Sequence, residues 1–379
     1  MVRAGHRVTM LTSPAQLVPG EIPQQGGLIR PTRIDGLDAL VLMVSYRQEM
    51  SLPRRAWSFL GFMVLACWVV LTRPNVDLVY ATSTPLTVAV PALLGRFLRR
   101  VPFFFEVRDL WPDIPIALGL LPNPVLRFAA KALEKLAYRH ALVCVAVNPD
   151  VAREMARIAG KRLDVVVACN ACDTDLFRPD ARASASCAAR IEGKVVAVHT
   201  GAMGRVNALD RILDAAAALH DEENLLFLLV GRGNERAHVI RRVARERLAN
   251  VQIWDPMPKS ELAGLLGEVD FGLMTVSPVP ILEKNCANKF FDYLAAGLPV
   301  CLNYKGWQAE LLERHGCGLS ASQGDQQAFE SAIRKLYGSA SLRTEMAGRA
   351  RRAAETELSR TAAVTPILRK LSEASDRLK

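Results

Sequence analysis

The stretch EKNCANKFFDYLAAGLPV, residues 283–300, decides how this chain is expected to fold. It begins in a polar turn, becomes a short helix over 290–296, and stops at Gly297. Glycine just past a helix and Pro299 soon after it form an ordinary helix stop, and a hydrophobic strand follows. The pattern therefore predicts a helix that leads directly into a buried strand.

The polar residues of this stretch gather at the start of the predicted helix. Asn288, Lys289 and Asp292 lie at the helix start and one turn in, so their side chains face one place. Free backbone N–H groups and the positive end of the helix dipole suit a phosphate there, and Lys289 adds a full charge. Asp292 is placed to accept from a sugar hydroxyl. Taken alone, the stretch is also explained by an amphipathic core helix with a solvated start.

Length and composition describe a globular protein large enough for two domains. The chain has 379 residues, of which 50% are hydrophobic and 23% charged, and this suits two packed cores. The net charge of +10 indicates an anionic partner such as a nucleotide, a lipid phosphate or an acidic membrane face. Because the basic residues are scattered and no nucleic-acid module is recognised, we expect no nucleic-acid partner.

The eight cysteines indicate buried thiols rather than a metal site. Most lie in apolar segments, and Cys169 and Cys172 form a single C-x-x-C pair. One such pair without a second pair or a nearby histidine is weak evidence for zinc. We expect free thiols in a reducing cytoplasm.

From residue 76 onward, apolar strands alternate with helices, which predicts α/β domains with parallel sheets covered on both faces. A polar segment rich in Pro, Ala and Ser interrupts the alternation. We therefore predict two doubly wound, Rossmann-like domains, at 1–178 and 195–379, joined by a linker at 179–194. The last helices of the second domain can cross back to the first. Ligands of such sheets bind at the carboxyl ends of the strands, here in the cleft between the domains.

The start of the chain differs from that of a complete α/β domain. HRVTMLTS, residues 6–13, predicts a strand, and the MVRAG before it resembles the tail of a helix. A strand, a glycine-rich turn and a helix normally precede this point. Either the start codon lies upstream, which we favour, or the protein is shortened. We expect the first domain to lack its N-terminal, inner strand and the chain from Met1 to be poorly active.

Residues 56–72, AWSFLGFMVLACWVVLT, form an uncharged segment after Arg54 and Arg55. A spanning helix needs about 20 apolar residues, so the segment is at the lower limit. The alternatives are a helix packed on a sheet and a helix lying in the membrane interface with arginines as anchors. We favour these two over a true span, because a buried-type strand follows at once.

Glycines mark two strand ends in the second domain. Gly201 and Gly204 lie between a strand and a helix, where the backbone can approach a diphosphate, and Arg205 adds charge. Gly231 and Gly233 follow the next strand. Tight turns alone explain such glycines, but two of these turns together with Lys289 favour a nucleotide lying across the domain.

The segment FEVRDLWPD, residues 105–113, places four charges at the end of a strand in the first domain. A solvated loop with an Arg–Asp pair explains them, as does a site at the mouth of a cleft. The four residues are Glu106, Arg108, Asp109 and Asp113.

Six sequence segments, together with the order in which they occur, resemble the retaining family-4 glycosyltransferases with the GT-B fold. The resemblance covers nearly all of the chain. The bacterial members that build O-antigen or capsule, including N-acetylfucosaminyl transferases, look most similar. The segments are FEVRDLWPD, NACDTDLFRP, HTGAMGRVNALDRILDAA, LLVGRGNER, NVQIWDPMPKSELAGLLGEVDFGLM and ANKFFDYLAAGLPV.

The resemblance implies roles for the glycine turns of the second domain. The loop from Gly201 to Gly204, with Arg205, would face the donor diphosphate. The strand end at Gly231 would hold the nucleoside, with the base near Met257.

The resemblance also gives a role to the stretch from Glu283 to Val300. Asp292 matches the second glutamate of the family's E-x7-E pair, which binds the ribose hydroxyls. The first glutamate falls at Lys284, so backbone amides, Asn285 or Asn288 would contact the transferred sugar instead. Lys289 would bind the donor phosphate.

In the first domain, this chain has Arg108-Asp109 where many family members have His-Asp. Retaining transfer in the family is pictured as front-face attack in which the leaving phosphate takes the acceptor proton, so a histidine base is not essential. The resemblance then implies that Arg108 and Asp109 position sugar or acceptor, with Glu106 and Asp113 on the acceptor side. GT-B enzymes generally work without bound metal, so we expect no metal and no cofactor beyond the nucleotide-sugar.

The resemblance predicts an enzyme that moves a hexosyl or N-acetylhexosaminyl group from a nucleotide-sugar, UDP-linked, to a lipid-linked glycan in surface-polysaccharide synthesis. Such an acceptor predicts a cytoplasmic protein, peripheral on the inner face of the membrane. Anionic lipids there would attract the arginines of the acceptor domain: Arg54, Arg55, Arg96, Arg99 and Arg100. The alternatives are a sugar-nucleotide 2-epimerase and a degenerate, non-catalytic scaffold.

Overall fold

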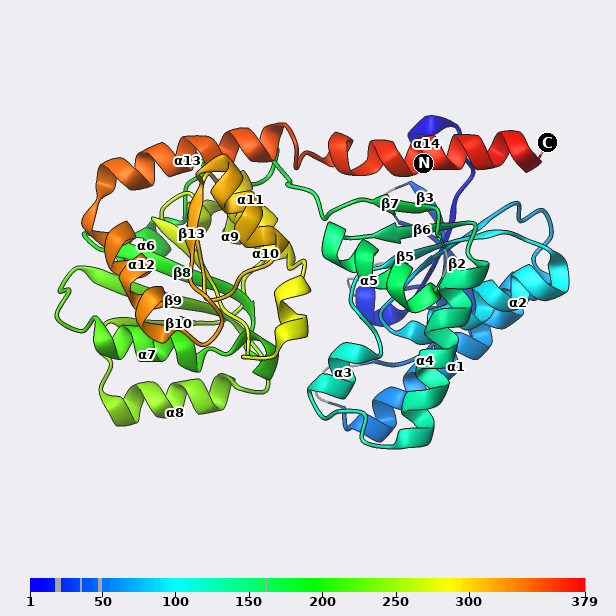
Figure 1. Ribbon diagram of the computed structural model, residues 1–379, viewed down its shortest axis with the longest axis horizontal. Helices are drawn as coiled ribbons and strands as arrows, with labels where there is room; N and C mark the ends of the chain where they lie inside the picture. The colour runs from blue at the N-terminus through cyan, green and yellow to red at the C-terminus, as the bar shows by residue number, and fades with distance from the viewer. Residues whose placement is uncertain (18–21, 35, 47–49, 161, 379) are drawn as a thin grey trace. The chain divides into compact units, whose positions relative to one another are not determined.

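The computed structural model describes residues 1–17, 22–34, 36–46, 50–160 and 162–378 (Figure 1). They form two compact units, one of Met1–Ala168 with Pro366–Lys379 and one of Cys169–Thr365. Each unit is built from helices and mostly parallel strands, which confirms the predicted α/β fold class. The boundary after Ala168 precedes the predicted end at 178, and the segment predicted as a linker belongs to the second unit.

The second unit is organised around a parallel sheet with the strand order β10-β9-β8-β11-β12-β13. Its inner strands are runs of Val, Leu, Ala and Phe without polar alternation, as parallel strands covered on both faces require. The strands are β8 Val195–Ala202, β9 Leu225–Arg232, β10 Val251–Trp254, β11 Phe271–Met274, β12 Val300–Leu302 and β13 Gly318–Ser320.

Helices pack against this sheet, and Figure 1 shows α7 and α8 on one side of it and α11 and α13 on the other. One core of this unit joins Phe227 and Phe271 of the sheet to Ile212 and Phe329 of helices, all fully buried. The helices are α6 Ala185–Ala189, α7 Asp210–Ala218, α8 Arg236–Glu246, α9 Lys259–Leu266, α10 Asn288–Ala295, α11 Trp307–His315, α12 Gln326–Gly338 and α13 Ala340–Glu355.

The helix predicted from the opening stretch is α10, and the prediction is confirmed. Gly297 follows it in the left-handed region, with φ of 72°, and β12 begins at Val300. The side chains of Phe290, Phe291 and Tyr293 are buried. The stretch is therefore both a core helix and the source of the polar groups described below.

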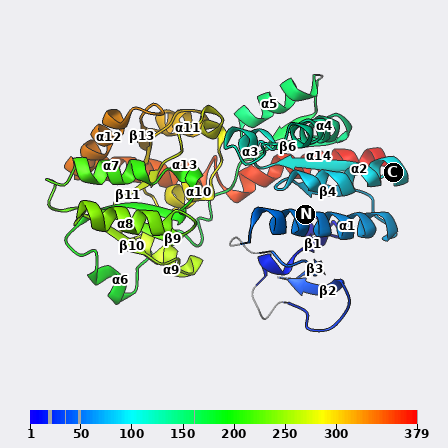
Figure 2. The ribbon, with the colours of Figure 1, turned by 90° about the horizontal axis from the view of Figure 1, so that it is seen from below.

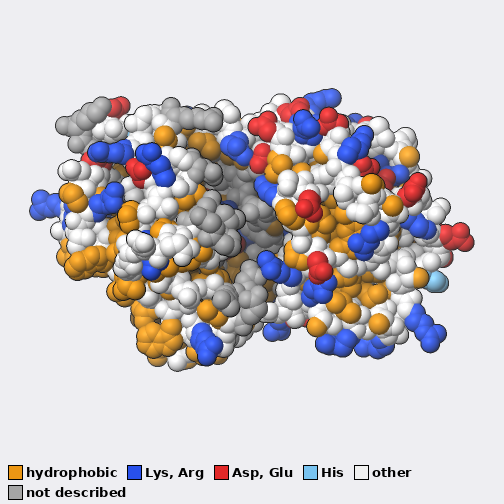
Figure 3. Space-filling view, turned by 180° about the vertical axis from the view of Figure 1, so that it is seen from behind, with side chains coloured by type: hydrophobic (Ala, Val, Ile, Leu, Met, Phe, Trp, Pro, Cys, Tyr) orange, Lys and Arg blue, Asp and Glu red, His pale blue; other side chains and the backbone are white. Residues whose placement is uncertain are grey.

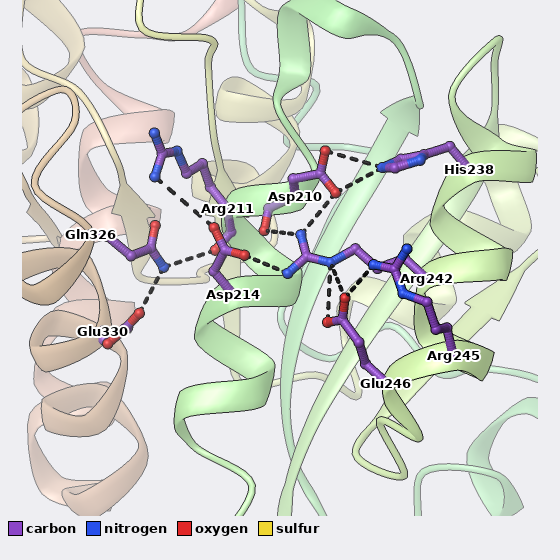
Figure 4. A network of polar contacts seen from close by, with 9 residues as sticks. All are labelled: Asp210, Arg211, Asp214, His238, Arg242, Arg245, Glu246, Gln326 and Glu330. Atoms are coloured by element: carbon purple, nitrogen blue, oxygen red, sulfur yellow. Dashed lines mark hydrogen bonds and ion pairs between the residues drawn. The ribbon is translucent and has the colours of Figure 1, made fainter.

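Helices α7 and α8 are joined by Arg242, whose guanidinium is shared by three carboxylates (Figure 4). It donates to Asp210 Oδ1 at 2.8 Å, to Glu246 Oε1 at 3.0 Å and to Asp214. On the far side of Asp210, Nε2 of His238 lies 3.0 Å from the carboxylate. Because the Arg242 side chain is only 14% exposed, these bonds are partly shielded from water.

Replacing Arg242 with alanine removes the cation that three neighbouring carboxylates share. We expect the free energy of unfolding to fall by about 1.5–3 kcal/mol, the range for hydrogen bonds to charged groups. Urea unfolding followed by tryptophan fluorescence measures this. The exposed neighbour Arg241→Ala is the control, with an expected change within about 0.5 kcal/mol. Equal losses in the two variants would contradict a role for the network.

The first unit contains two sheets in its described residues. One is parallel, with the order β4-β5-β6-β7. The other has the order β1-β3-β2, in which β1 pairs parallel and β2 antiparallel to β3. The strands are β1 Thr9–Thr12, β2 Ile29–Ile34, β3 Leu37–Leu42, β4 Val79–Thr82, β5 Phe103–Val107, β6 Val143–Ala146 and β7 Val165–Val167.

Strand β2 forms in a part of the chain whose residues do not favour a strand. Its sequence, IRPTRI, contains a proline and two arginines, and it forms because a hairpin pairs it along its whole length with β3. Pro31 is tolerated because β2 is an edge strand, where one missing backbone donor need not break a ladder.

Three helices of the first unit, α1, α2 and α4, pack side by side, with α2 in the middle. In Figure 2 they lie in the half of the picture that also holds β4 and β6. Leu371 and Ala374 of α14 are buried together with Phe104 and Val143 of the parallel sheet. The helices are α1 Leu52–Thr72, α2 Ala89–Arg99, α3 Asp113–Ala117, α4 Pro124–His140, α5 Pro149–Ala159 and α14 Arg360–Leu378.

Candidate functional site

The sheet of the second unit changes direction at β8. The chain passes from β8 to β9 and β10 on one side, and then returns to place β11 on the other side. Connections leave in opposite directions at such a point, so a crevice opens at the carboxyl ends of the two central strands, where open α/β sheets bind ligands. Here these ends are the residues that follow β8 and β11.

Two glycine turns bring the ends of β8 and β9 unusually close together. A Cβ on Gly231 would lie 1.9 Å from the carbonyl oxygen of Gly201, and one on Gly233 would lie 2.3 Å from that of Met203. Gly231 has φ of 151° and Gly233 has φ of 155°, which side chains disfavour. Gly204 and Gly233 follow their strands as predicted, whereas Gly201 and Gly231 are the next-to-last residues of β8 and β9 and pair with each other in the sheet. At Gly231 and Gly233 glycine is required by packing.

The loop after β8 is held in place from β11. Ser277 donates its hydroxyl to the Arg205 carbonyl and its own amide to the Val206 carbonyl, the latter at 2.9 Å. Thr275 donates to the carbonyl of Asn207. Arg205 itself is exposed at the turn. The backbone of this loop is therefore fixed while the Arg205 side chain faces solvent.

Lys289 of α10 reaches beneath this loop. Its Nζ lies 3.2 Å from His199 Nε2 and donates to Asn207 Oδ1 at 3.3 Å. Its Cε would lie 3.7 Å from a Cβ at Gly201. Burial lowers the pKa of Lys289 to about 7. Burial and the nearby Lys289 charge lower the pKa of His199 well below its usual value, so this histidine is neutral at pH 7.

Tyr293 fixes α10, and hence Lys289, to the sheet. Its hydroxyl accepts from the Thr200 amide at 2.8 Å. A Cβ on Gly272 of β11 would lie 2.4 Å from the Tyr293 ring. The ring therefore bridges β8 and β11 just below the turns where Lys289 emerges.

Asp292, one turn along α10, lies in a second polar group. Its carboxylate is 4.0 Å from Lys259 Nζ, which is also 3.7 Å from Asp173. Asp173 in turn pairs with Arg360 at 3.1 Å. Burial raises the pKa of Asp292 to about 6, with Asp173 adding to the rise and Lys259 opposing it. The side chain is 17% exposed, so it can still reach a ligand.

Three other residues of this unit were predicted to contact the donor, and they differ in their hydrogen bonds and exposure. Asn285 uses its amide inside its own loop, donating to the Leu282 carbonyl at 2.8 Å. Asn288, at the start of α10, is exposed. Met257 is half-buried in the turn after β10. Their predicted contacts with a donor sugar and base stay predictions.

The charges predicted at the end of β5 lie with hydroxyl groups from the end of β4. Thr82 donates to Glu106 at 3.0 Å and Thr84 donates to Asp109 at 3.0 Å. The amide of Arg108 donates to the Ser83 hydroxyl at 3.2 Å, and the Arg108 side chain is exposed.

Asp113 begins α3 and pairs with Lys131 of α4 at 3.2 Å. The carboxyl ends of β4 and β5 thus carry a hydrogen-bonded acidic cluster.

The cysteine pair does not form a metal site in the described structure. Cys169 and Cys172 are free thiols whose pKa values burial raises to about 11 and about 12. Among the described residues no three His, Cys, Asp or Glu side chains are grouped so that they could hold a metal ion.

Two family models match the chain. The glycosyl transferase 4-like domain matches residues 1–171, and the model described as glycosyl transferases group 1 matches residues 194–339. The two matches follow the division into two units and include the turns after β8 and β9 and helix α10. The chain is a GT-B glycosyltransferase. Both matches favour a transferase over a sugar-nucleotide 2-epimerase.

Solved structures share the fold at low sequence identity. The sucrose-phosphate synthase of Thermosynechococcus elongatus has a TM-score of 0.74 and 14% identity, covering 98% of this chain and 91% of its own. Anabaena Alr3699/HepE, solved with UDP-glucose, has a TM-score of 0.66 and 20% identity over 82% of each chain. WaaG, involved in lipopolysaccharide biosynthesis, has a TM-score of 0.66 and 14% identity, covering 96% and 92%. A comparison with curated protein sequences finds no match.

His199 and Asn207 are residues that the sequence analysis missed. Both contact Lys289, and they are 90 and 82 positions away from it along the chain. The available signal was a lone histidine at the end of an otherwise apolar strand, in KVVAVHTG. Only the parallel order of β8 beside β11 shows that this histidine meets α10.

A Gly231→Ala substitution tests the close approach of the two turns. Its Cβ cannot fit 1.9 Å from the Gly201 carbonyl oxygen, so the β8 and β9 ends must separate. We expect a loss of more than about 2 kcal/mol in the free energy of unfolding. Gly204→Ala is the matched control, because no atom lies within 4 Å of its added Cβ and its φ is −126°. A Gly231→Ala variant as stable as Gly204→Ala would refute the argument.

Proposed function

We propose that this glycosyltransferase takes its sugar from a UDP-sugar, with retention of configuration, and transfers it to a lipid-linked glycan in surface-polysaccharide synthesis. The donor assignment rests on the position of Lys289. Its partly buried amine lies under the Gly201 turn, where the sheet changes direction. A buried amine with neutral partners gains most from a ligand that brings negative charge.

The donor diphosphate would lie between the Gly201–Gly204 turn and the start of α10. Gly201 and Gly204 offer backbone without side chains on either side of Ala202 and Met203, and within the part of the chain that the structure describes no side chain caps the N-terminus of α10 at Ala287. Lys289 and Arg205 would neutralise the phosphates from below and from the solvent side. Asn207 and neutral His199 hold the lysine in place without competing as charges.

The nucleoside would extend from the diphosphate toward Asp292 and the strand end at Gly231. An ionised Asp292 would accept hydrogen bonds from the two ribose hydroxyls, and Met257 lies in the turn after β10, where a base would pack. HepE, solved with UDP-glucose and with UDP, supports UDP as the nucleotide. Asn285 and Asn288 would contact the transferred sugar.

In the transfer step, the bond between the sugar anomeric carbon and the UDP oxygen breaks, and a bond to the acceptor hydroxyl oxygen forms on the same face. The acceptor proton passes to the leaving phosphate oxygen. Lys289 stabilises the charge that develops on this phosphate, so it acts on the reacting group directly. Arg108 and Asp109, with Glu106 and Asp113, would position the acceptor. No metal or other cofactor is required in this scheme.

The similarity to WaaG supports a lipid-linked acceptor, since that protein is involved in lipopolysaccharide biosynthesis. Such an acceptor sits at a membrane surface, and the basic net charge of +10 suits an anionic one. We therefore place the enzyme in the cytoplasm, peripheral on the inner face of the membrane, in the synthesis of O-antigen or capsule.

Nucleotide binding tests the donor site. UDP at about 100 times its dissociation constant adds about 2.7 kcal/mol to native stability, which a thermal-shift assay detects. We expect this shift with UDP and not with GDP or ADP, and a loss of at least tenfold in UDP affinity in Lys289→Ala and in Asp292→Asn. Lys335→Ala, an exposed lysine on α12, is the control and should bind UDP as the parent does.

The donor proposal fails if no nucleotide stabilises the protein, or if Lys289→Ala binds UDP unchanged. Turnover of UDP-sugars on a lipid-linked acceptor tests the acceptor proposal separately. Binding of UDP without transfer to any lipid-linked glycan would remove the acceptor assignment and leave the donor site standing.

The affinity for UDP should depend on pH in a predictable direction. Above its pKa of about 7, the Lys289 amine is neutral in the empty protein. Binding of the diphosphate must then be accompanied by the uptake of a proton onto this amine. Affinity therefore falls as pH rises from 7 to 9, by up to tenfold per pH unit. Below the pKa of about 6 Asp292 is protonated and accepts poorly, so affinity also falls toward pH 5.

Calorimetry in buffers of different ionisation enthalpy measures this proton uptake at pH 8. Lys289→Ala should remove both the uptake and the alkaline fall in affinity, whereas Asp292→Asn should keep them. An alkaline fall that persists in Lys289→Ala would show that another group titrates.

A further inference from the structure

Exposed apolar side chains are distributed very unevenly between the two units. The described residues include sixteen large hydrophobic side chains that are exposed, and only Ile240 belongs to the second unit. Ten of the sixteen lie on α1, α2 and α4, which pack side by side. They are Trp57, Leu60, Val64, Trp68, Phe97, Leu98, Val125, Leu126, Phe128 and Leu136. Figure 3 shows part of the apolar surface of this unit in orange, at the left and lower left.

On α1 the exposed apolar residues form one stripe along the helix. Trp57, Leu60, Val64 and Trp68 follow one another at intervals of three or four residues, so they share a face. Trp57 is 72% exposed and Trp68 is 64% exposed. Tryptophan is the residue most suited to the boundary between water and lipid, because its ring is amphipathic.

The stripe continues onto the two neighbouring helices. Gly95 of α2 lets α1 approach so closely that a Cβ there would lie 2.8 Å from Val70. Phe97 of α2 meets His140 of α4 edge to face, with ring centroids 4.9 Å apart. Phe128 of α4 is 77% exposed, the most exposed of the group. The three helices therefore present one joined surface, which we call the helical face.

The helical face carries positive charge and almost no negative charge. Helices α1 and α2 contain no Asp or Glu, and the single one in α4, Glu134, is 2% exposed and bonded to Tyr138. The same helices carry eight basic residues: Arg54, Arg55, Arg96, Arg99, Arg127, Lys131, Lys135 and Arg139. Each Lys or Arg near an anionic bilayer adds about 1 kcal/mol of attraction.

Over Pro53–Thr72, helix α1 is by length and composition long and apolar enough to cross a membrane, and only a small part of this stretch is buried in the protein. Its inner side, however, is part of the fold. Ala66 and Val69 are buried against Leu42 of β3, and Arg99 of α2 donates to the carbonyls of Val70 and Arg73 at 2.6 and 2.7 Å. A spanning α1 would uncover the β1-β3-β2 sheet and break these bonds.

We propose that the helical face docks the first unit on an anionic lipid bilayer, with α1 lying in the plane of the interface. Trp57, Trp68 and Phe128 enter the boundary between headgroups and acyl chains, and the basic residues contact the lipid phosphates. This deepens the proposed function by assigning the surface through which the enzyme meets its lipid-linked acceptor. A lipid surface fits this face better than a second copy of the chain does, because basic residues outnumber acidic ones on its three helices and two such faces would repel each other.

Sedimentation of the full chain with vesicles tests the docking. We expect the protein to pellet at low salt with vesicles containing phosphatidylglycerol and to stay in the supernatant with pure phosphatidylcholine. About 0.5 M salt should release part of the bound protein, because salt screens the attraction between basic residues and anionic lipids. Trp57→Ser combined with Arg96→Glu should weaken binding at least tenfold. The matched control, Ile240→Ser with Arg241→Glu, makes the same two kinds of change on the second unit and should bind as the parent does.

Helix orientation is read from the depth of two tryptophans. Trp57 and Trp68 are separated by about 16 Å along α1, at about 1.5 Å per residue. Quenching by lipids brominated at a fixed depth is measured in Trp57→Phe and in Trp68→Phe, each of which keeps one of the pair. Equal depths indicate a helix in the plane. Depths that differ by most of that length would mean that α1 spans, and would overturn the proposal.

Three further results would overturn docking: a chain that stays in the supernatant at low salt, equal pelleting of the variant and its control, or self-association that the Trp57→Ser, Arg96→Glu variant abolishes while vesicle binding is unchanged. UDP thermal shifts in the same variants show that the second unit is intact. If vesicle binding occurs but no lipid-linked acceptor is used, the proposed function fails and the docking surface stands.

Discussion

The hydroxyl of Tyr293 fixes the geometry on which the donor site depends. By accepting from the Thr200 amide while its ring packs on Gly272, Tyr293 locks α10 across the two central strands of the sheet. Lys289, one turn earlier, can then reach only the space beneath the Gly201 turn. The position of the amine thus follows from a buried hydrogen bond and a missing side chain rather than from the loop that a ligand would contact.

The local features of the site could be predicted from sequence, whereas its long-range partners could not. Helix α10, its stop at Gly297 and the turns at Gly201 and Gly231 follow from residue types within a few positions of one another. His199 was missed because a histidine in an apolar strand gives no sign of what lies on the neighbouring strand. Its role requires the order of β8 and β11 in the sheet, which residue patterns leave open.

The same limit applies in the first unit. Strand β2 has a poor strand sequence and exists because β3 pairs with it. The apolar run of α1 was evident, but three interpretations of it remained, because composition does not say which side of a helix the sheet covers. Once Ala66 and Val69 are seen to face β3, the exposed side is defined, and α4 adds residues that no single segment had suggested.

The contact between the turns after β8 and β9 also bears on how such sequences should be compared. Any change in the first two bases of a glycine codon replaces glycine with a residue that has a Cβ or with a stop. At Gly231 and Gly233 such a residue would collide with a backbone carbonyl, with or without a ligand. Natural selection would keep these two glycines even in a descendant that had lost its substrate. Their persistence among relatives would therefore record the packing of two strands, and evidence of retained catalysis must come from Lys289 and Asp292.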